Sequence, residues 1–203
     1  MPLSVPSPVD GDDGALEPLD TASVAARVRV APPRLGTVRL VVVDGPAGSG
    51  KTTTAAALAA ALGDAPVLHM DDLYEGWSGL NADVWTRMWA QVLEPLRAGR
   101  PGRYQRYDWE KGRFAEWHDV PAGPLLVVEG VGAAAAAMEP YASLRVWVEA
   151  PPGIRLHRGV LRDGEPLRDE WLRWSARELE HFEADGTKDR ADVRVDGTAP
   201  PVS

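Results

Sequence analysis

The residues from Gly45 to Thr52, which read Gly-Pro-Ala-Gly-Ser-Gly-Lys-Thr, match the pattern G-x-x-x-x-G-K-[ST] at every fixed position. Glycine tolerates backbone angles that other residues avoid, so successive N–H groups of such a loop can converge on phosphate oxygens. We expect Lys51 to reach the β- and γ-phosphates of a nucleoside triphosphate, and the Thr52 hydroxyl to ligate Mg²⁺. The residues predicted to contact the nucleotide are Gly45, Ala47, Gly48, Ser49, Gly50, Lys51, Thr52 and Thr53.

The segments on either side of this loop have the character that the motif requires. Val38–Val43 is an apolar, mostly β-branched run that predicts a strand, and the alanine-rich segment Thr53–Leu62 predicts a helix. A strand, a glycine-rich loop and a helix in this order form the setting in which the motif binds phosphate. A chance glycine-rich turn is therefore disfavoured.

Two further predicted strands end in carboxylates. Asp71 and Asp72 follow the segment Pro66–His69, and Glu129 follows the apolar run Leu125–Val128. Because ligands bind at the carboxyl ends of parallel strands, we expect these carboxylates to face the phosphate loop. One aspartate could accept the proton of an attacking hydroxyl while the other holds Mg²⁺, and Glu129 is in the usual position for a second Mg²⁺-directed group. A helix cap, a solvated turn or an ordinary strand end are the alternatives.

A short segment near the C-terminus has the features of a lid. Arg162–Asp169 contains the glycine and the proline of a loop, with Arg162 and Arg168 near its two ends. Arginines lowered over a triphosphate would neutralise charge on the transferred group and exclude water. We therefore expect a small lid at about residues 162–170, although loop arginines can also be exposed without any such role.

The composition limits the classes of function. The chain has 203 residues, of which 22 are basic and 30 are acidic, and its formal net charge is −8. This balance gives no support for binding to nucleic acid or to an anionic membrane. The absence of cysteine excludes disulfides, thiolate catalysis and cysteine-ligated zinc, and the four histidines have no metal-ligand spacing. With no predicted membrane span or signal peptide, we expect a cytoplasmic protein.

The remaining segments predict a doubly wound α/β fold, in which a parallel sheet of about five strands is flanked by helices. Residues 1–35 are expected to form a partly disordered tail (1–20) and a short helix (Thr21–Val30), and residues 36–203 the main domain. Helices are predicted at Asn81–Leu96, Gly132–Met138, Ile154–Leu161 and Glu170–Phe182, and further strands at Leu144–Val148 and Asp192–Val195.

The segment at about residues 71–120 is the predicted acceptor-binding region. It contains Trp77, Trp85, Trp89, Trp109 and Trp117, which are five of the eight tryptophans. The tryptophans of the predicted helix Asn81–Leu96 fit a core position better than a ligand platform. Gly99–Pro124 shows no clear periodicity, so an inserted acceptor-binding segment and a small satellite core both remain open.

Five short motifs occur in the order seen in the uridine kinase-like P-loop kinases, a group that also includes phosphoribulokinase and bacterial pantothenate kinase. After the phosphate loop come Asp71-Asp72-Leu73-Tyr74, Tyr107-Asp108-Trp109, Val128-Glu129-Gly130 and Arg158-Gly159-Val160-Leu161-Arg162-Asp163. The closing Lys188-Asp189-Arg190-Ala191-Asp192-Val193 also resembles the end of that family. The resemblance covers roughly residues 38–196 and implies a P-loop NTPase fold.

The resemblance also implies roles for individual residues. Asp71 would be the base that faces the acceptor hydroxyl; Thr52 and Glu129 would serve Mg²⁺, for which the residues themselves also suggest Asp72; and Arg162 and Arg168 would belong to the lid. Tyr107 and Trp109 would stand where the family contacts its acceptor, and we also expect Asp71, Tyr74 and Arg158 to bind it. However, Glu110–Arg113 lacks the histidine with which uridine kinases read a pyrimidine, and an aspartate expected before Asp83 has no counterpart. The resemblance thus predicts phosphoryl transfer without predicting a nucleoside acceptor.

The sequence therefore predicts a kinase that transfers the γ-phosphoryl group of ATP to a hydroxyl of a small molecule, with Lys51, Asp71, Arg162 and Arg168 as catalytic residues. A cytidylate-type nucleoside monophosphate kinase is one alternative. It would need arginines for the acceptor phosphate, which Arg87, Arg103, Arg106 and Arg113 could supply. A non-catalytic, ATP-binding regulatory protein is the alternative from another class. A translational-type GTPase is disfavoured because no Asn-Lys-x-Asp motif follows the strands.

Overall fold

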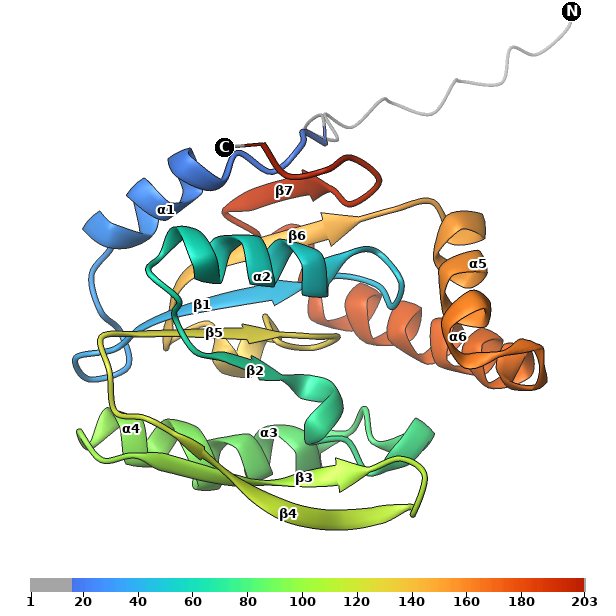
Figure 1. The fold of residues 1–203 in the computed structure, drawn as a ribbon, viewed down its shortest axis with the longest axis horizontal. Helices are drawn as coiled ribbons and strands as arrows, with labels where there is room; N and C mark the ends of the chain where they lie inside the picture. The colour runs from blue at the N-terminus through green and yellow to red at the C-terminus, as the bar shows by residue number, and fades with distance from the viewer. Residues whose placement is uncertain (1–15, 203) are drawn as a thin grey trace, which may run out of the picture.

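The computed structural model describes residues 16–202, and Figure 1 shows their arrangement around one central sheet. The sheet has five strands in the order β2-β5-β1-β6-β7, and every neighbouring pair is parallel. The strands are β1 (Arg39–Asp44), β2 (Val67–His69), β5 (Leu125–Glu129), β6 (Ala142–Glu149) and β7 (Val193–Asp196). The predicted doubly wound parallel sheet of about five strands is confirmed.

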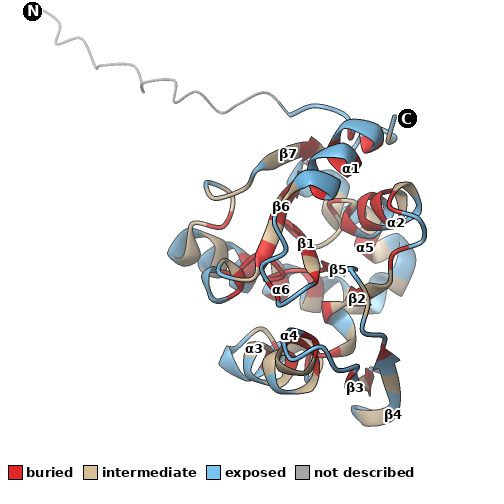
Figure 2. Ribbon diagram, turned by 90° about the vertical axis from the view of Figure 1, so that its left-hand side faces the viewer, coloured by how far each residue is buried: buried red, intermediate tan, exposed pale blue. Residues whose placement is uncertain are grey.

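Both faces of the sheet are covered because successive side chains of a strand point to opposite faces. From β1, Val41 and Val43 pack in a core with α1 (Thr21–Val30) and α2 (Lys51–Ala61). Leu40 and Val42 join the other core, which holds residues of α3 (Ala82–Met88), α4 (Glu94–Arg97) and α6 (Arg168–Asp185). The buried residues are concentrated in the central strands between these layers (Figure 2).

The predicted helix Asn81–Leu96 is one long helical segment with a local irregularity. α3 begins after Asn81, whose side chain accepts the N–H of Asp83 as a cap. A π-helical turn, Trp89–Leu93, joins α3 to α4. The side chains of Trp85 and Trp89 pack against the core, as the helical pattern predicts.

Gly99–Pro124, for which the sequence shows no regular pattern, contains a two-stranded antiparallel hairpin. It consists of β3 (Gly102–Asp108) and β4 (Arg113–Val120), and it lies outside the main sheet (Figure 1). The pairing shifts register between Gln105 and Tyr107. An irregularity of this kind breaks the period of two by which a strand is recognised.

Two predicted elements differ in the structure. The predicted helix Gly132–Met138 is a series of turns that ends in one 3₁₀ turn, Ala136–Met138. The predicted lid loop is mostly helical, because α5 (Pro152–Asp163) continues through Asp163 and α6 starts at Arg168. Only Gly164 and a 3₁₀ turn, Glu165–Leu167, separate these helices.

The predicted disordered tail falls largely outside the described residues, and only residues 16–20 can be compared with it. Here Glu17 forms a parallel bridge with Val195 of β7, and the Asp196 N–H donates to the Glu17 carbonyl over 2.8 Å. Leu19 is buried in the core with α1 and α2. This part of the chain therefore extends the sheet beyond β7. Within residues 16–202, none of the helices combines the length and the apolar character needed to cross a bilayer.

Candidate active site

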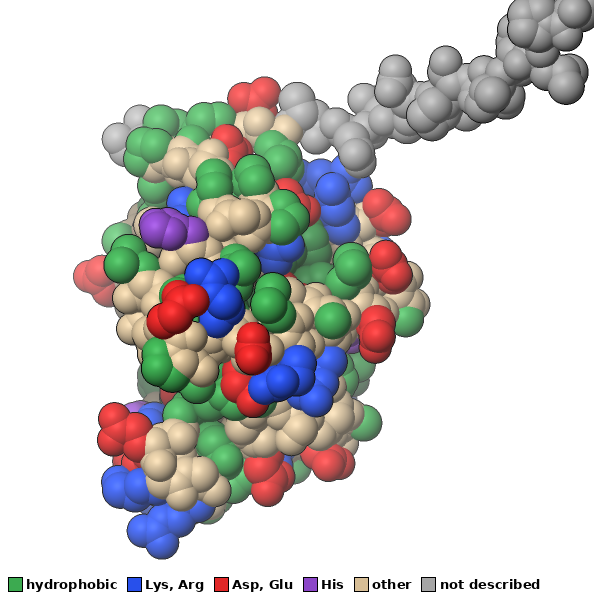
Figure 3. Space-filling model, turned by 90° about the vertical axis from the view of Figure 1, so that its right-hand side faces the viewer, with side chains coloured by type: hydrophobic (Ala, Val, Ile, Leu, Met, Phe, Trp, Pro, Cys, Tyr) green, Lys and Arg blue, Asp and Glu red, His purple; other side chains and the backbone are tan. Residues whose placement is uncertain are grey.

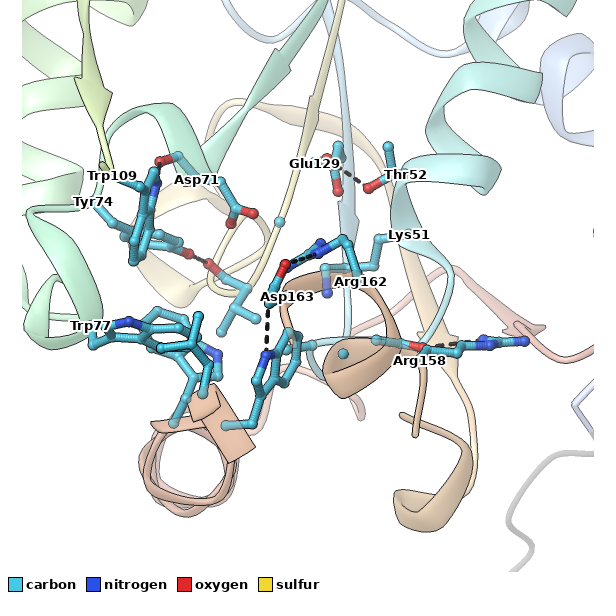
Figure 4. A pocket seen from close by; sticks show the side chains of 18 of the residues that line it. Lys51, Thr52, Asp71, Tyr74, Trp77, Trp109, Glu129, Arg158, Arg162 and Asp163 are labelled. Carbon is cyan, nitrogen blue, oxygen red and sulfur yellow. Dashed lines mark hydrogen bonds and ion pairs between the residues drawn. The ribbon is translucent and has the colours of Figure 1, made fainter. Parts of the chain in front are cut away.

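A cavity of about 770 Å³ lies where the carboxyl ends of the strands meet the phosphate loop (Figure 4). The predicted residues that line it are Ala47, Gly48, Gly50, Lys51, Thr52, Thr53, Asp71, Asp72, Tyr74, Trp109, Glu129, Arg158 and Arg162. The predicted residues that do not line it are Gly45, Ser49, Tyr107 and Arg168. Acidic and basic side chains are interspersed on the molecular face at these strand ends (Figure 3).

The glycines of the phosphate loop are required by close backbone contacts as well as by backbone angles. Gly45 has a φ of +142° and Gly48 a φ of +78°, both in a region that favours glycine. A Cβ atom at Gly45 would lie 2.1 Å from the Val148 carbonyl oxygen, and one at Gly48 would lie 2.6 Å from that of Arg155. Gly45 therefore shapes the loop without lining the cavity, and Ser49 is fully buried.

Lys51 and Thr52 begin helix α2, so the positive end of its dipole points into the cavity. The Lys51 ammonium donates to the Pro46 carbonyl over 2.9 Å, and the side chain is only 7% exposed. The Thr52 hydroxyl donates to Glu129 over 3.2 Å. Lys51 is thus held within the loop that would surround a polyphosphate.

A buried ion pair between Arg155 and Glu178 supports the phosphate loop. The sequence analysis did not identify it. Glu178 of α6 accepts the Ala47 N–H over 2.8 Å and pairs with Arg155 of α5, also over 2.8 Å. Glu178 is 1% exposed, and this burial raises the pKa of its carboxyl group. The spacing of Arg155 and Glu178 carries no motif, so only their contacts in space reveal the interaction.

A second buried carboxylate, Asp44, joins β1 to the segment after β5. It accepts the N–H groups of Gly45, Gly132 and Ala134 over 2.7, 3.0 and 2.8 Å. The predicted helix Gly132–Met138 is interrupted at Ala135, whose ψ of 154° is not helical. Desolvation of the fully buried side chain raises the pKa of Asp44 to about 7, against the opposing effect of these hydrogen bonds.

The oxygen atoms near Thr52 fit a magnesium site. Glu129, which is 5% exposed, lies beside the Thr52 hydroxyl, and Asp72 lines the same cavity. Hard oxygen donors of this kind suit Mg²⁺, which is commonly held by one or two carboxylates together with substrate phosphates. No group of three or more His, Asp or Glu side chains in residues 16–202 forms a complete metal cage. The donor set therefore suits a metal that is bound jointly with a nucleotide.

His69 is a further neighbour of the Glu129 carboxylate. The sequence analysis did not single out this histidine. Its Nδ1 lies 2.6 Å from a Glu129 oxygen, and this hydrogen bond raises the pKa of the imidazole. Because His69 is the last residue of β2 and Glu129 the last residue of β5, parallel pairing of the strands aligns them. The sequence does not show that β2 pairs with β5, so the contact between His69 and Glu129 was not predicted.

Asp71 and Asp72 lie in a 3₁₀ turn, Met70–Asp72, immediately after β2. Asp71 is open to the cavity, and its pKa is raised, first by the protein atoms that crowd around it and then by the negative charge of Glu129. Asp72 accepts the Tyr104 hydroxyl over 2.9 Å. A carboxylate with a raised pKa, beside a phosphate loop, is suited to accept a proton from a hydroxyl group.

The predicted lid arginines have different positions. Arg162 lines the cavity and pairs with Asp163 over 2.7 Å (Figure 4). Arg168 is exposed and pairs with Glu165 over 2.5 Å, outside the cavity lining. Arg168 starts α6, and its side chain folds back on the preceding turn instead of reaching the strand ends.

Arg158 and Tyr107, which we expected to bind the acceptor, contact other parts of the protein. The Arg158 guanidinium donates to the carbonyl oxygens of Gly48 and Gly197, each over 3.1 Å, so it braces the phosphate loop (Figure 4). Tyr107 is 7% exposed and packs edge-to-face with Trp109 at 5.7 Å between ring centres. Its position supports Trp109, which itself lines the cavity.

The side of the cavity opposite Lys51 and Thr52 is aromatic. Tyr74 and Trp109, which the sequence predicts, are joined here by Trp77 (Figure 4). Trp171 and Trp174 of α6 complete this surface, although the sequence pattern assigns them only to a helix. A surface drawn from three separate segments leaves no continuous motif in the sequence.

Comparisons with known proteins identify the fold. The chain is similar to a possible uridine kinase from Bacillus stearothermophilus, with a TM-score of 0.64 and 19% identity over 87% of this chain and 97% of that one. It is also similar to a candidate fructose transport system kinase from Silicibacter sp. TM1040, with a TM-score of 0.62 and 19% identity over 87% of this chain and 98% of that one. This chain has a P-loop NTPase fold. No protein-family model matches the chain, and no curated protein matches its sequence.

Proposed function

We propose that this protein is a kinase that transfers the γ-phosphoryl group of ATP to a hydroxyl group of a small molecule. The observation that carries this proposal is the shared cavity, in which Lys51 and Thr52 of the phosphate loop face Asp71 across a space of about 770 Å³. A nucleotide-binding protein without an acceptor has no need of a base in the same cavity as the phosphate loop.

The proposed mechanism combines positioning with charge stabilisation. The acceptor oxygen attacks the γ-phosphorus while Asp71 accepts the hydroxyl proton, and the bond from that phosphorus to the β–γ bridging oxygen breaks to release ADP. Lys51 and Arg162 stabilise negative charge on the transferred group. Thr52, Glu129 and Asp72 would hold Mg²⁺, which neutralises phosphate charge when it is bound.

A nucleoside monophosphate kinase is the weaker candidate within this class. None of the four arginines that could bind an acceptor phosphate is among the cavity-lining residues. Arg103 pairs with Asp119 over 3.4 Å, and Arg106 pairs with Glu116 over 2.5 Å. Arg87 donates to the Leu73 carbonyl, and Arg113 is exposed on the hairpin. An acceptor phosphate would therefore lack a prepared cationic partner in this conformation.

An ATP-consumption screen tests the proposal. The full-length protein with Mg²⁺ and ATP is incubated with nucleosides, nucleotides, sugars and vitamin precursors, and Lys51→Ala serves as the blank. We expect at least one alcohol to raise ATP consumption above the basal rate, with a phosphorylated product detected by mass spectrometry. ATP binding without acceptor-stimulated consumption would instead support the non-catalytic regulatory alternative.

A further inference from the structure

The acceptor half of the cavity has an aromatic wall, which we define as Tyr74, Trp77, Trp109, Trp171 and Trp174. We infer from this wall, and from the charges beside it, that the acceptor is a hydroxyl compound that carries an apolar ring and no anionic group. This inference rests on the proposed kinase function. It adds the chemical class of the substrate.

The rings of the wall support one another around Trp77. Trp77 makes edge-to-face contacts with Trp109, Trp171 and Trp174, with ring centres 5.5, 6.0 and 6.0 Å apart. Tyr74 packs edge-to-face on Trp174 at 5.3 Å. Tyr74, Trp171 and Trp174 are almost fully buried, so they support the half-buried Trp77 and Trp109, which is 39% exposed. The wall thus offers a firmly backed aromatic surface, on which a ligand ring would gain contacts that a small polar alcohol would not.

Hydrogen bonds fix the wall relative to the proposed base. The Trp109 indole N–H donates to the Asp71 carbonyl over 3.0 Å, so this ring lies directly beside the residue that would accept the proton. The Trp77 carbonyl accepts the Arg177 guanidinium over 2.7 Å, and the Trp171 indole N–H donates to Asp163 over 3.0 Å. A ring placed against Trp109 therefore brings its substituents close to Asp71. Preorganised contacts of this kind reduce the entropic cost of binding.

The charges around the acceptor half oppose an anionic ligand. The acidic residues Asp71, Asp72 and Glu110 line this region. The described cavity-lining residues include three cations, of which Lys51 and Arg162 would serve the transferred phosphoryl group and Arg158 donates to a carbonyl of the phosphate loop. A carboxylate or phosphate on the acceptor would therefore meet like charges without a dedicated partner. Such an arrangement selects against anions.

A matched series of ring alcohols tests the inference by binding alone. Benzyl alcohol, 4-(aminomethyl)benzyl alcohol and 4-(hydroxymethyl)benzoate share the ring and the hydroxyl but differ in charge. Their affinities for the full-length protein, with Mg²⁺ and a non-hydrolysable ATP analogue, are measured by saturation-transfer NMR titration up to about 10 mM, the range expected for ligands of this size. We expect the neutral and cationic compounds to bind at least about tenfold more tightly than the carboxylate. Equal or tighter carboxylate binding, or no binding of the other two, would overturn the inference.

Two tryptophan variants locate the binding surface. Trp109→Ala should weaken benzyl alcohol binding by at least about tenfold, whereas Trp109→Phe should retain most of it. The matched control is Trp117→Ala, because Trp117 is also exposed on the hairpin, at 46%, but contacts Arg103 outside the cavity lining. The affinity for the ATP analogue should be unchanged in all three variants, which also reports that they are folded. Unaltered benzyl alcohol binding by Trp109→Ala would show that the ligand binds elsewhere and would refute the aromatic wall as its binding surface.

The two proposals can fail separately. Charge-selective ring binding without any phosphoryl transfer would refute the proposed kinase function and would still support the ring-binding site. Efficient phosphorylation of an anionic acceptor would support the kinase and overturn the substrate class inferred here.

Discussion

The two halves of the cavity are built in different ways. The phosphate half is made of one continuous stretch of backbone, in which glycines permit close approaches that a Cβ atom would block. The acceptor half is made of side chains from residues 71–77, the β3–β4 hairpin and helix α6. Backbone N–H groups can bind any polyphosphate, whereas side chains can differ from one protein to another. We infer that the donor is bound by features common to the fold, and the acceptor by features particular to this chain.

The strongest test of this division is the replacement of Asp71 by asparagine. The asparagine amide cannot accept a proton but preserves the size and polarity of the side chain, so we expect Asp71→Asn to lower phosphoryl transfer by about 10²–10⁴-fold. ATP affinity, measured by titration calorimetry, should stay within about threefold because the base belongs to the acceptor half. A loss of ATP affinity equal to the loss of turnover would show that the two halves are not separable.

Glu178 provides the second test, on the support of the phosphate half. Glu178→Ala removes the acceptor of the Ala47 N–H and leaves Arg155 unpaired with its side chain 14% exposed. We expect the free energy of unfolding to fall by about 3 kcal/mol, and ATP affinity to fall by about tenfold. Glu178→Gln keeps a hydrogen-bond acceptor and should restore most of the ATP affinity.

The control for this effect is Glu170→Ala on the same helix. Glu170 pairs with the exposed Arg173 over 2.6 Å, and exposed pairs contribute little to stability. Chemical denaturation and ATP titration should give values close to those of the unmodified protein. A similar loss of ATP affinity in both variants would indicate a general effect of α6 instead of support for the loop.

The two lid arginines form a third, smaller comparison. Both pair with a nearby acidic side chain, but only Arg162 lines the cavity. We expect Arg162→Ala to lower kcat by about 10–100-fold, because the charge on the transferred group loses a partner, whereas Arg168→Ala should change it by less than about threefold. Steady-state kinetics with the acceptor found in the screen measure both. An equal loss in the two variants would show that Arg168 moves into the site during turnover.

The fourth prediction concerns the dependence of stability on pH. Because burial raises the pKa of Asp44 from 3.8 to about 7, the folded protein binds this proton more tightly than the unfolded chain. The stabilisation by protonated Asp44 is complete below about pH 4, is lost as the pH rises toward about 7, and changes no further above that. Denaturant unfolding at several pH values should show this slope, at most about 1.4 kcal/mol per pH unit, in the unmodified protein and not in Asp44→Asn. If the free energy of unfolding depended on pH in the same way in both proteins, this prediction would be contradicted.

The sequence predicted the parts of the structure whose signals are local. The phosphate loop, the five sheet strands and the helix Thr21–Val30 follow from contiguous patterns of apolar residues, glycine and proline. Asp71, Asp72 and Glu129 were expected at this cavity, which all three line, because each lies at or just beyond the end of a predicted strand. Positions at the ends of parallel strands are informative because the sheet brings these ends together.

The parts that escaped prediction depend on contacts between distant segments. The hairpin was missed because its register shift buries both Tyr104 and Tyr107, three residues apart, which a regular alternation cannot do. The predicted helix after β5 was wrong because Ala135 has non-helical backbone angles, in a segment whose first amides donate to Asp44, about 90 residues earlier. The ion pair of Arg155 with Glu178 is likewise a product of helix packing that no local pattern records.

The pairing of residues 16–20 with β7 has a practical consequence for altering this protein. The edge of the sheet is completed by the start of the described chain, and Val202 near its other end donates to Leu19 over 2.7 Å. Just beyond β7, Gly197 lies against the Ser49 carbonyl of the phosphate loop. Insertions within residues 16–20 or 197–202 would therefore disturb an edge of the sheet that lies beside the phosphate loop. The exposed turn at Gly63 and Asp64, where α2 has already led away from the loop, is the better insertion point.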